Sequence, residues 1–411
     1  MIAVQVLNTR CCIAGGGPAG MMLGFLLARA GVDVVVLEKH ADFFRDFRGD
    51  TIHPSTLEVM RELGLLDAFL ALPHQEVQEL RGEVFGSSFT LADFRHVPTH
   101  CKFLALIPQW DFLNFIATQA RRYPGFHLHM SSEVTGVIEE NGVVVGVEAK
   151  TEHGPLHVRA GLVVGADGRH TTVRGSAGLE VIESGAPIDV LWFRLPRKPE
   201  DSAATGGYIE PGRFFVMIYR DAYWQCAYVI PKGGFDALQS AGLEAFKAQV
   251  VAVAPLTRSS IGTLTSWDDI KLLTVQIDRL RQWFRPGVLC IGDAAHAMSP
   301  VGGVGINLAV QDAVAAANAL AVPLRDGTLE ISDLQAVQRR REWPTAVTQR
   351  AQIAVQNRVV APVLAAAGDA HGPRKPPLFL RIIRWLPFLQ RIPARVIGVG
   401  VRPEHVQSPV G

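Results

Sequence analysis

Three acidic residues stand where a carboxylate could hold the hydroxyl groups of a sugar. Glu38, Asp167 and Asp293 each come at the end of a short apolar run that predicts a buried β-strand. In an open α/β sheet the carboxyl ends of the strands face the ligand crevice, so a carboxylate there can accept hydrogen bonds from a ligand. Asp167 has a simpler alternative, because an aspartate between a strand and a helix often serves only as a helix N-cap.

A glycine turn precedes the first of these carboxylates. Gly15, Gly17 and Gly20 fit the spacing GxGxxG, and Glu38 lies 18 residues after the last of them. Such glycines allow a tight turn, a close backbone approach to a pyrophosphate and tight packing of a helix on a strand. The pattern predicts a dinucleotide site in which Glu38 accepts hydrogen bonds from an adenosine ribose. These residues alone do not distinguish FAD from NAD.

The elements around this turn can be placed from the sequence. The sequence predicts a strand over 11–14, a helix over 21–30 and a second buried strand over 32–37. Pro18 stands near the helix start, where a missing N–H group is tolerated. The N-terminal end of this helix would then meet the phosphates.

A second glycine-rich stretch follows Asp293. The sequence predicts a strand over 287–291 and a helix over 308–319, with glycines crowding the start of that helix. Glycines there expose backbone N–H groups, which form a pocket for delocalised negative charge together with the helix dipole. A reduced flavin is anionic at its pyrimidine edge. The stretch therefore predicts Asp293 on the ribityl chain and the helix start around the flavin ring.

Taken together, these motifs resemble those of the p-hydroxybenzoate hydroxylase-like, or class A, flavoprotein monooxygenases. That family carries GxGxxG near the start, a DG pair in mid-chain and a late GDAAHxxxPxxGxGxN motif. The resemblance covers about residues 8 to 350. The late motif is matched by Gly292, Asp293, Ala294, Ala295, His296, Pro300, Gly303, Gly305 and Asn307.

The resemblance implies roles that the patterns alone do not assign. Arg48 matches the arginine that touches the cofactor, Gln109 the glutamine at the flavin side chain, and Val134 the residue whose backbone meets the adenine. Arg48 and Pro300 are the candidates for a catalytic role, although the chemistry lies mainly on the flavin. A surface charge at Arg48 and an exposed helix start at Gln109 are the simpler alternatives.

The predicted cofactor-binding set combines the motifs with these matches. Asp167 and Gly168 form the DG pair, which the family ties to both FAD and NAD(P)H, and His170 departs from the family there. For His53 and His296 a structural role is the favoured interpretation. The predicted set consists of Gly15, Gly17, Pro18, Ala19, Gly20, Glu38, Lys39, Arg48, Gln109, Val134, Asp167, Gly168, Asp293, Gly303, Gly305, Ile306 and Asn307.

Composition narrows the class of protein. The 411-residue chain has a formal net charge of +1, which gives no reason to expect a nucleic-acid partner. The five cysteines show no metal-ligand spacing and suggest a reducing compartment, so we expect a cytoplasmic protein and no metal site. Its longest apolar stretch is broken by glycines and a proline, so we expect no transmembrane segment.

We expect an α/β fold in which a Rossmann-like FAD-binding domain is interleaved with an antiparallel-sheet substrate domain, followed by a helical C-terminal region. The FAD-binding parts are 1–75, 100–182 and 272–375. The substrate domain comprises 76–99 and 183–271, where aromatic residues alternate as in antiparallel strands. Half of these aromatic residues should face the flavin, but the sequence does not indicate which.

The tail, residues 376–411, contains the basic and apolar segment 377–399. A lid that packs over the other domains is the favoured interpretation, and a peripheral membrane contact is the alternative.

The resemblance implies an NADH- or NADPH-dependent FAD monooxygenase. Such an enzyme would use O2 to form a flavin C4a-hydroperoxide and hydroxylate an aromatic or polycyclic small molecule. A flavoprotein reductase or dehydrogenase that does not activate O2 is the first alternative. A flavin-dependent halogenase is the second, but the WxWxIP stretch that such enzymes share corresponds here to residues 226–231, which lack both tryptophans.

Overall fold

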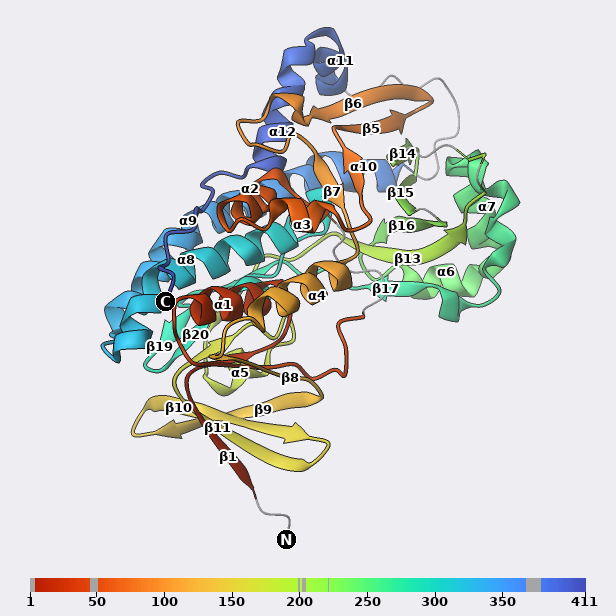
Figure 1. The fold of residues 1–411 in the computed structure, drawn as a ribbon. Helices are drawn as coiled ribbons and strands as arrows, with labels where there is room; N and C mark the ends of the chain where they lie inside the picture. Colours follow the sequence, from red (N-terminus) through yellow and green to blue (C-terminus); the bar gives the residue numbers. More distant parts are fainter. Residues whose placement is uncertain (1–3, 45–50, 199, 202–204, 221, 367–377) are drawn as a thin grey trace.

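The fold is built on two large sheets that lie side by side (Figure 1). We describe it from a computed structural model that covers residues 4–44, 51–198, 200–201, 205–220, 222–366 and 378–411. The first sheet carries the predicted dinucleotide motifs, and the second holds the aromatic-rich insertion. Arg48 lies outside the described residues.

The first sheet has eight strands, and five neighbouring ones are parallel. Its central order is β19-β20-β11-β1-β2-β8, and β9 and β10 continue from β11 in antiparallel pairing. The strands are β1 (Gln5–Ala14), β2 (Val34–Leu37), β8 (Phe126–His129), β9 (Ser132–Glu140), β10 (Val143–Thr151), β11 (Gly154–Gly165), β19 (Phe284–Arg285) and β20 (Val288–Cys290).

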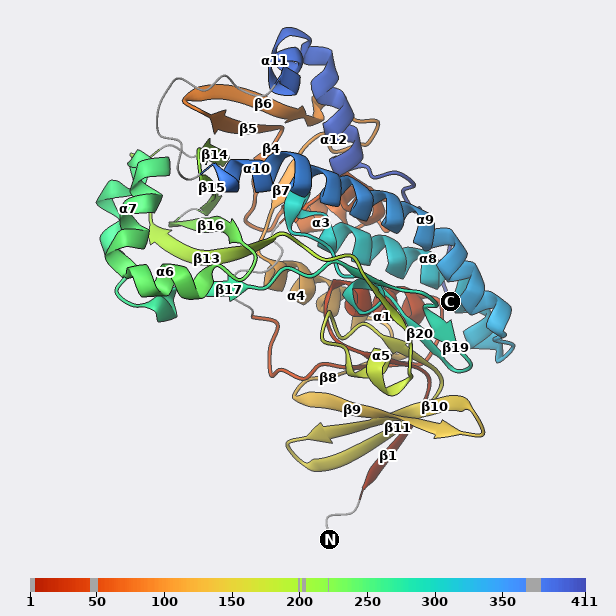
Figure 2. The same cartoon turned by 180° about the vertical axis from the view of Figure 1, so that it is seen from behind.

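Apolar helices pack against this sheet and against one another. The largest hydrophobic core joins α1 and α8 to the strands, because nearly every residue of α1 is buried. Figure 2 shows α9 running alongside α8 toward the second sheet. The helices of this layer are α1 (Pro18–Arg29), α4 (Gln109–Ala120), α8 (Gly305–Asp326) and α9 (Ile331–Val355).

The second sheet has seven strands in the order β17-β13-β16-β15-β14-β5-β6. Its pairs are antiparallel except for β14 with β5, which run parallel. Segments 79–93 and 188–273 therefore contribute strands to one sheet. These are β5 (Glu79–Val84), β6 (Ser87–Asp93), β13 (Ile188–Pro196), β14 (Gly206–Glu210), β15 (Arg213–Arg220), β16 (Tyr223–Pro231) and β17 (Lys271–Leu273).

Short elements complete the fold. Two small sheets join β3 (Thr51–Ile52), β7 (Leu104–Leu106) and β4 (Gln75–Val77), and β12 (Val181–Glu183) with β18 (Asp278–Leu280). The remaining helices are α2 (Pro54–Glu62), α3 (Leu66–Leu70), α5 (Thr172–Ser176), α6 (Phe235–Ala241), α7 (Leu243–Val253), α10 (Ala361–Ala365), α11 (Leu378–Trp385) and α12 (Arg391–Gly398).

Several predicted boundaries differ from the observed ones. Helix α1 begins at Pro18, and β1 begins at Gln5 rather than at residue 11. The first part of β1 is partly exposed, so its hydrophobicity gave no signal, and pairing with β11 makes it a strand. Helix α8 is longer than predicted. The stretch Val301–Asp326 is long and apolar enough to cross a bilayer, but most of its apolar window is buried, as in the core helix of a globular protein.

Candidate cofactor-binding site

The loops that carry the three predicted carboxylates leave the first sheet at one edge. Strands β2, β1, β11 and β20 are neighbours and run parallel, and their last residues are in register: Leu37 with Ala14, Ala14 with Gly165, and Gly165 with Cys290. The three inter-strand steps of about 4.8 Å give the edge a width of roughly 14 Å. Strand β2 pairs with one side of β1 and β11 pairs with the other. The edge beside β1 is therefore a topological switch point, the place at which open α/β sheets bind ligands.

The glycine turn between β1 and α1 is shaped by close backbone contacts. Gly15 has a φ of +104°, and a Cβ atom there would lie 2.3 Å from the carbonyl oxygen of Ala166. A Cβ atom on Gly20 would lie 2.0 Å from the carbonyl oxygen of Gly15. Both glycines are therefore required by the protein's own packing.

Gly17 is different, because no atom of the described chain lies within 4 Å of the position its Cβ would occupy. It is the N-cap of α1, and within the described structure no side chain caps that helix end. The helix therefore begins with open space and free backbone N–H groups in front of it. This arrangement fits the pyrophosphate of a dinucleotide.

Glu38 is held in place by the backbone of the same turn. Its side chain is buried, and its two carboxylate oxygens accept hydrogen bonds from the N–H groups of Gly16 (2.9 Å) and His40 (3.1 Å). These two bonds fix the carboxylate at the carboxyl end of β2, where dinucleotide-binding folds place an acidic residue on the ribose. Lys39 is exposed. Buried Val134 lies on β9, whose first residue, Ser132, donates to the Glu38 carbonyl (2.8 Å).

Asp167 holds the start of α5 through one oxygen, although the N-cap of that helix is Thr171 and not Asp167 as the simpler alternative predicted. Its Oδ2 accepts hydrogen bonds from the N–H groups of Thr172 (2.7 Å) and Val173 (3.1 Å) in the first turn of α5. Its Oδ1 is buried and has no hydrogen-bond partner among the described residues. Burial raises the pKa of this carboxyl group. The neighbouring Gly168 has a φ of +80°.

Asp293 lies at the far end of the edge, and its side chain is one-third exposed. Its Oδ2 lies 3.4 Å from Nη2 of Arg169, which joins the loop after β20 to the loop after β11. Sequence reasoning missed Arg169, because no local pattern announces a contact across 124 residues. The pair places a cation beside the carboxylate that we expect on the ribityl chain.

The glycine-rich start of α8 has the same open character as that of α1. Gly302 and Gly303 have positive φ values, and no side chain within the described ranges caps the helix. A Cβ atom on Gly303 would lie 3.3 Å from Oγ1 of Thr51, whereas Gly305 has open space beside it. The first-turn N–H groups, which include that of buried Ile306, are thus available to an anionic ring edge.

The side chain of Asn307 is already used inside the protein. Its Oδ1 accepts hydrogen bonds from the N–H of His53 (2.8 Å) and the hydroxyl of Thr56 (2.7 Å), and its Nδ2 donates to the Thr51 carbonyl (3.2 Å). Its Oδ1 is fully used, so its backbone N–H and the second hydrogen on Nδ2 are left for a cofactor. Thr51 also pairs with Leu106 at the end of β7, and half-buried Gln109 opens α4 shortly afterwards.

His53 is fully buried beside this helix start, and its tautomer follows from its contact. Nδ1 lies 2.7 Å from the carbonyl oxygen of Ile397, which can only accept, so Nδ1 carries the proton. Burial lowers the pKa of His53 to about 4. Nε2 is thus an unprotonated acceptor, and it has no partner in the part of the chain described. It lies 3.9 Å from the position of a Cβ atom on Gly303.

A buried network of charges below the edge was not predicted. His296 Nε2 lies 2.5 Å from Asp312, Asp312 accepts from Arg341 (2.9 Å), and Arg341 donates to Glu404 (3.1 Å). Burial raises the pKa of Asp312, but His296 and Arg341 outweigh it, so the net pKa is lowered. Asp312 also accepts from the N–H of Gly292 (3.0 Å), next to Asp293. His296 therefore braces the loop, in line with the favoured interpretation.

Three glutamines on one face of α9 and its continuation hold the loop around Pro300. Gln349, Gln352 and Gln356 are buried and contact the carbonyl of Ala297, the backbone of Ser299 and the hydroxyl of Ser299, respectively. Sequence reasoning missed them too. Their spacing of three and four residues in a helical stretch was the available signal, since buried glutamines need partners.

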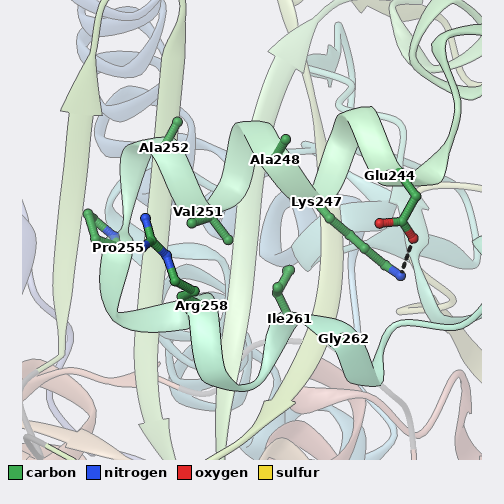
Figure 3. A pocket seen from close by; sticks show the side chains of 9 residues that line it. All are labelled: Glu244, Lys247, Ala248, Val251, Ala252, Pro255, Arg258, Ile261 and Gly262. Atoms are coloured by element: carbon green, nitrogen blue, oxygen red, sulfur yellow. Dashed lines mark hydrogen bonds and ion pairs between the residues drawn. The ribbon is translucent and has the colours of Figure 1, made fainter.

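Two surface hollows occur in the described structure, one remote from this edge and one beside the loop after Glu38. One, of about 650 Å³, runs along the outer face of α7, where Lys247 pairs with Glu244 at 2.7 Å (Figure 3). It holds none of the predicted site residues. The other, of about 250 Å³, lies between the loop after Glu38 and α4 and is lined by Phe44 and Trp110 among others. Neither carries the chemistry that the edge of the first sheet offers.

The fold and the edge define a dinucleotide-binding flavoprotein, and comparison with known proteins places the chain more closely. Residues 8–351 match the family described as "FAD binding domain". The chain is 34% identical to 6-methylpretetramide 4-monooxygenase of Streptomyces rimosus over 86% of this chain and 84% of that protein. The chain therefore belongs to this family and is an oxidoreductase of the FAD-dependent monooxygenase type.

Solved structures agree in fold. The OxyS anhydrotetracycline hydroxylase from Streptomyces rimosus matches with a TM-score of 0.73 at 22% identity, over 95% of this chain and 76% of that one. The myxobacterial chondrochloren halogenase CndH matches with a TM-score of 0.74 at 20% identity, over 95% and 91%. A hydroxylase and a halogenase share the architecture, so the fold alone does not separate these reactions.

Proposed function

We propose that this protein hydroxylates an aromatic, polycyclic small molecule with O2, using FAD as its cofactor and NADH or NADPH as its reductant. The observation that carries the proposal is the single sheet edge that joins Glu38, Asp293 and two helix N-termini without capping side chains in the described structure. One relative, which matches 86% of this chain, is named as a monooxygenase of 6-methylpretetramide, and this name supports the proposed substrate class.

The residues present along the edge fit FAD. Glu38 would accept hydrogen bonds from the adenosine ribose, and the open start of α1 would bind the pyrophosphate. Asp293 would hold the ribityl chain, and the N–H groups at the start of α8 would lie at the pyrimidine edge. Bound FAD would supply the redox and oxygen-transfer chemistry. The helix dipole of α8 would stabilise negative charge there, which favours the reduced cofactor.

The substrate side is best sought on one face of the second sheet. Trp192, Phe214 and Val216 lie in a cluster with Val301, the residue next to Pro300. The indole Nε1 of Trp192 is buried and has no acceptor among the described residues. A buried N–H without a partner has lost its water and gains from an acceptor on a ligand. We assign to Trp192 a hydrogen bond to a substrate oxygen.

The proposal is tested on the purified protein with its bound flavin. We expect a flavin absorbance spectrum that bleaches when NADH or NADPH is added without oxygen and returns in air. With 6-methylpretetramide, and not with p-hydroxybenzoate, nicotinamide oxidation and O2 uptake should rise and yield a product heavier by one oxygen atom. Isotopically labelled O2 should provide that atom.

Two other outcomes would overturn the proposal in distinct ways. Reduction and slow reoxidation without any oxygenated product, across a panel of polycyclic phenols, would indicate a flavoprotein reductase or dehydrogenase. A product that requires chloride or bromide and carries the halogen would indicate a halogenase. The second outcome is disfavoured, because Cys226 and Tyr228 occupy the two positions at which the halogenase stretch has tryptophan.

A further inference from the structure

The C-terminal segment 378–398 forms two consecutive short helices with large apolar side chains on their outside. Helices α11 and α12 are joined by a 3-10 turn at Pro387–Gln390 and lie against β6 at one end of the molecule (Figure 1). Trp385 is 82% exposed, Ile392 61% and Phe388 58%. Exposed apolar residues that cluster in this way mark an interaction surface in most globular proteins. The exposed apolar set is Ile382, Trp385, Leu386, Phe388, Ile392 and Val396.

The inner face of α12 is firmly docked, so its outer face cannot turn inward. Ala394 and Val399 are buried in a cluster with Phe94, and a Cβ atom on Gly398 would lie only 3.0 Å from the Phe94 ring. The carbonyl of Ile397 also holds the ring of His53. Among the described residues, burial of the outer face would require these contacts to break, so we take this face as a surface for an external partner.

The charge of the segment is of one sign. The sequence contains no Asp or Glu between Asp369 and Glu404, whereas arginine occurs at 381, 384, 391 and 395. Arg381, Arg391 and Arg395 are exposed beside the apolar side chains. Basic residues that flank an apolar helical face are typical of helices that lie in the interface of an anionic membrane.

We propose that the outer face of α11 and α12 binds the surface of a membrane that contains anionic lipids. Phe388 and Ile392 would enter the acyl boundary, Trp385 would lie at the headgroup level, and the arginines would contact lipid phosphates. A second copy of the chain fits less well, because a two-fold interface on this face would bring its arginines together. This proposal does not rest on the function proposed above.

The test is flotation of the full-length protein with two kinds of vesicle. We expect binding to vesicles of equal parts phosphatidylglycerol and phosphatidylcholine, little binding to phosphatidylcholine alone, and weaker binding as salt is raised. Arg391→Glu with Arg395→Glu should weaken binding by on the order of tenfold or more, since each arginine near an anionic surface contributes about fivefold. Trp385→Ser with Phe388→Ser should weaken it to a similar degree.

Helix α9 offers matched controls, because Arg339, Trp343 and Arg350 are also exposed there. Trp343→Ser, and Arg339→Glu with Arg350→Glu, should leave vesicle binding unchanged. All variants should keep the thermal midpoint of the parent, because the exchanged side chains are exposed. If the α9 variants lost vesicle binding to the same degree, the binding would depend on the general surface charge and not on α11 and α12. That result would overturn the proposal.

Two further results would also overturn the proposal. One is the absence of binding to either vesicle. The other is concentration-dependent self-association that Trp385→Ser with Phe388→Ser abolishes while vesicle binding is absent. That result would assign the face to a second copy of the chain.

Discussion

The edge of the first sheet and the faces of the second sheet are built by different means. At the edge, the groups offered to a ligand are mostly backbone N–H groups at the starts of α1 and α8, presented by glycine turns. In the second sheet, aromatic side chains fill both faces. Phe193 and Phe215 pack with Phe246 of α7 on one face, whereas Trp192 lies on the other with residues of α10 and its approach.

This difference decides what a sequence reveals. A site made of backbone restricts the residue type at a few positions, because only glycine fits the turn at Gly15 and the close contact at Gly20. A site made of side chains accepts many combinations of similar volume, so it carries no comparable signature. Exchanges in the two regions should therefore differ in their effects on stability and on ligand binding.

An exchange in the charged network under the edge should lower the stability of the protein more than the other exchanges considered. Arg341→Met removes the cation that Asp312 and Glu404 share, although Asp312 keeps His296 and Glu404 keeps Arg340, so we expect the free energy of unfolding to fall by about 3 kcal/mol. Urea denaturation measures this loss. The exposed Arg339→Met is the control and should change stability by less than about 0.5 kcal/mol. If both exchanges lowered the free energy of unfolding by the same small amount, the stability of the edge would not depend on the network.

His53 should make the stability of the edge depend on pH. Its pKa is lowered by burial from 6.5 to about 4, so the unfolded chain binds a proton in that interval that the folded chain does not. The contribution of neutral His53 to the free energy of unfolding is complete above pH 6.5. It is lost as the pH falls toward 4, by about 3 kcal/mol in total. We expect His53→Asn, whose amide can still donate to Ile397, to flatten the unfolding free energy between these pH values.

A matched exchange at the exposed His153 serves as the control for that experiment. His153→Asn should leave the pH dependence of the parent unchanged. If His53→Asn left the slope unchanged as well, the ring would not be buried as a neutral base, and its assignment as an acceptor in the site would fail.

Two alanine exchanges in the glycine turn should separate packing from ligand binding. Gly20→Ala places a Cβ atom against the Gly15 carbonyl, so we expect a loss of about 1–3 kcal/mol in stability. Gly17→Ala meets open space at a φ of −75°, and the loss at an N-cap position opposes the gain from a less flexible unfolded chain, so the stability of the apoprotein should stay within about 1 kcal/mol of the parent. FAD affinity of Gly17→Ala should nevertheless fall by on the order of tenfold, because the pyrophosphate needs that space.

Denaturation of the apoprotein and titration with FAD, followed by flavin fluorescence, measure the two effects independently. Unchanged FAD affinity in Gly17→Ala would place the pyrophosphate elsewhere. A stable Gly20→Ala protein would contradict the packing argument for that glycine.

Much of the edge could be predicted because its requirements are local in sequence. The glycine turn, Glu38 and the strand before Asp293 each follow from short patterns, and the parallel sheet then aligns them. Arg169 and Asp312 could not be predicted in the same way, since their partners lie on other segments. The sequence contains one signal for Asp312, because a carboxylate inside an alanine-rich helix requires a buried partner.

The alternation in the second sheet predicted two faces but not which would be nearer to Pro300. Both faces are buried by helices, so no exposed side marks the orientation of the strands. Only the positions of α7 on one face and of Val301 on the other show which face lies nearer to Pro300. Neither position follows from the strand sequences themselves.

Neighbouring residues of β13 allow the finest test of that assignment. Phe193→Leu removes ring contacts with Phe215 and Phe246, so we expect a loss of about 1–2 kcal/mol in stability with an unchanged KM. Trp192→Phe keeps a ring but removes the indole N–H, which has no partner among the residues described. Stability should therefore be nearly unchanged, whereas KM for the aromatic substrate should rise about three- to tenfold through the lost hydrogen bond.

The split between stability and KM is what makes this pair informative. A merely structural role for Trp192 would move the unfolding midpoint and leave KM alone, as for Phe193. The measurement is steady-state O2 uptake with the compound that best stimulates NAD(P)H oxidation, beside urea denaturation of the same preparations. If both exchanges changed only stability, the substrate would lie elsewhere, and the second sheet would serve as packing on both of its faces.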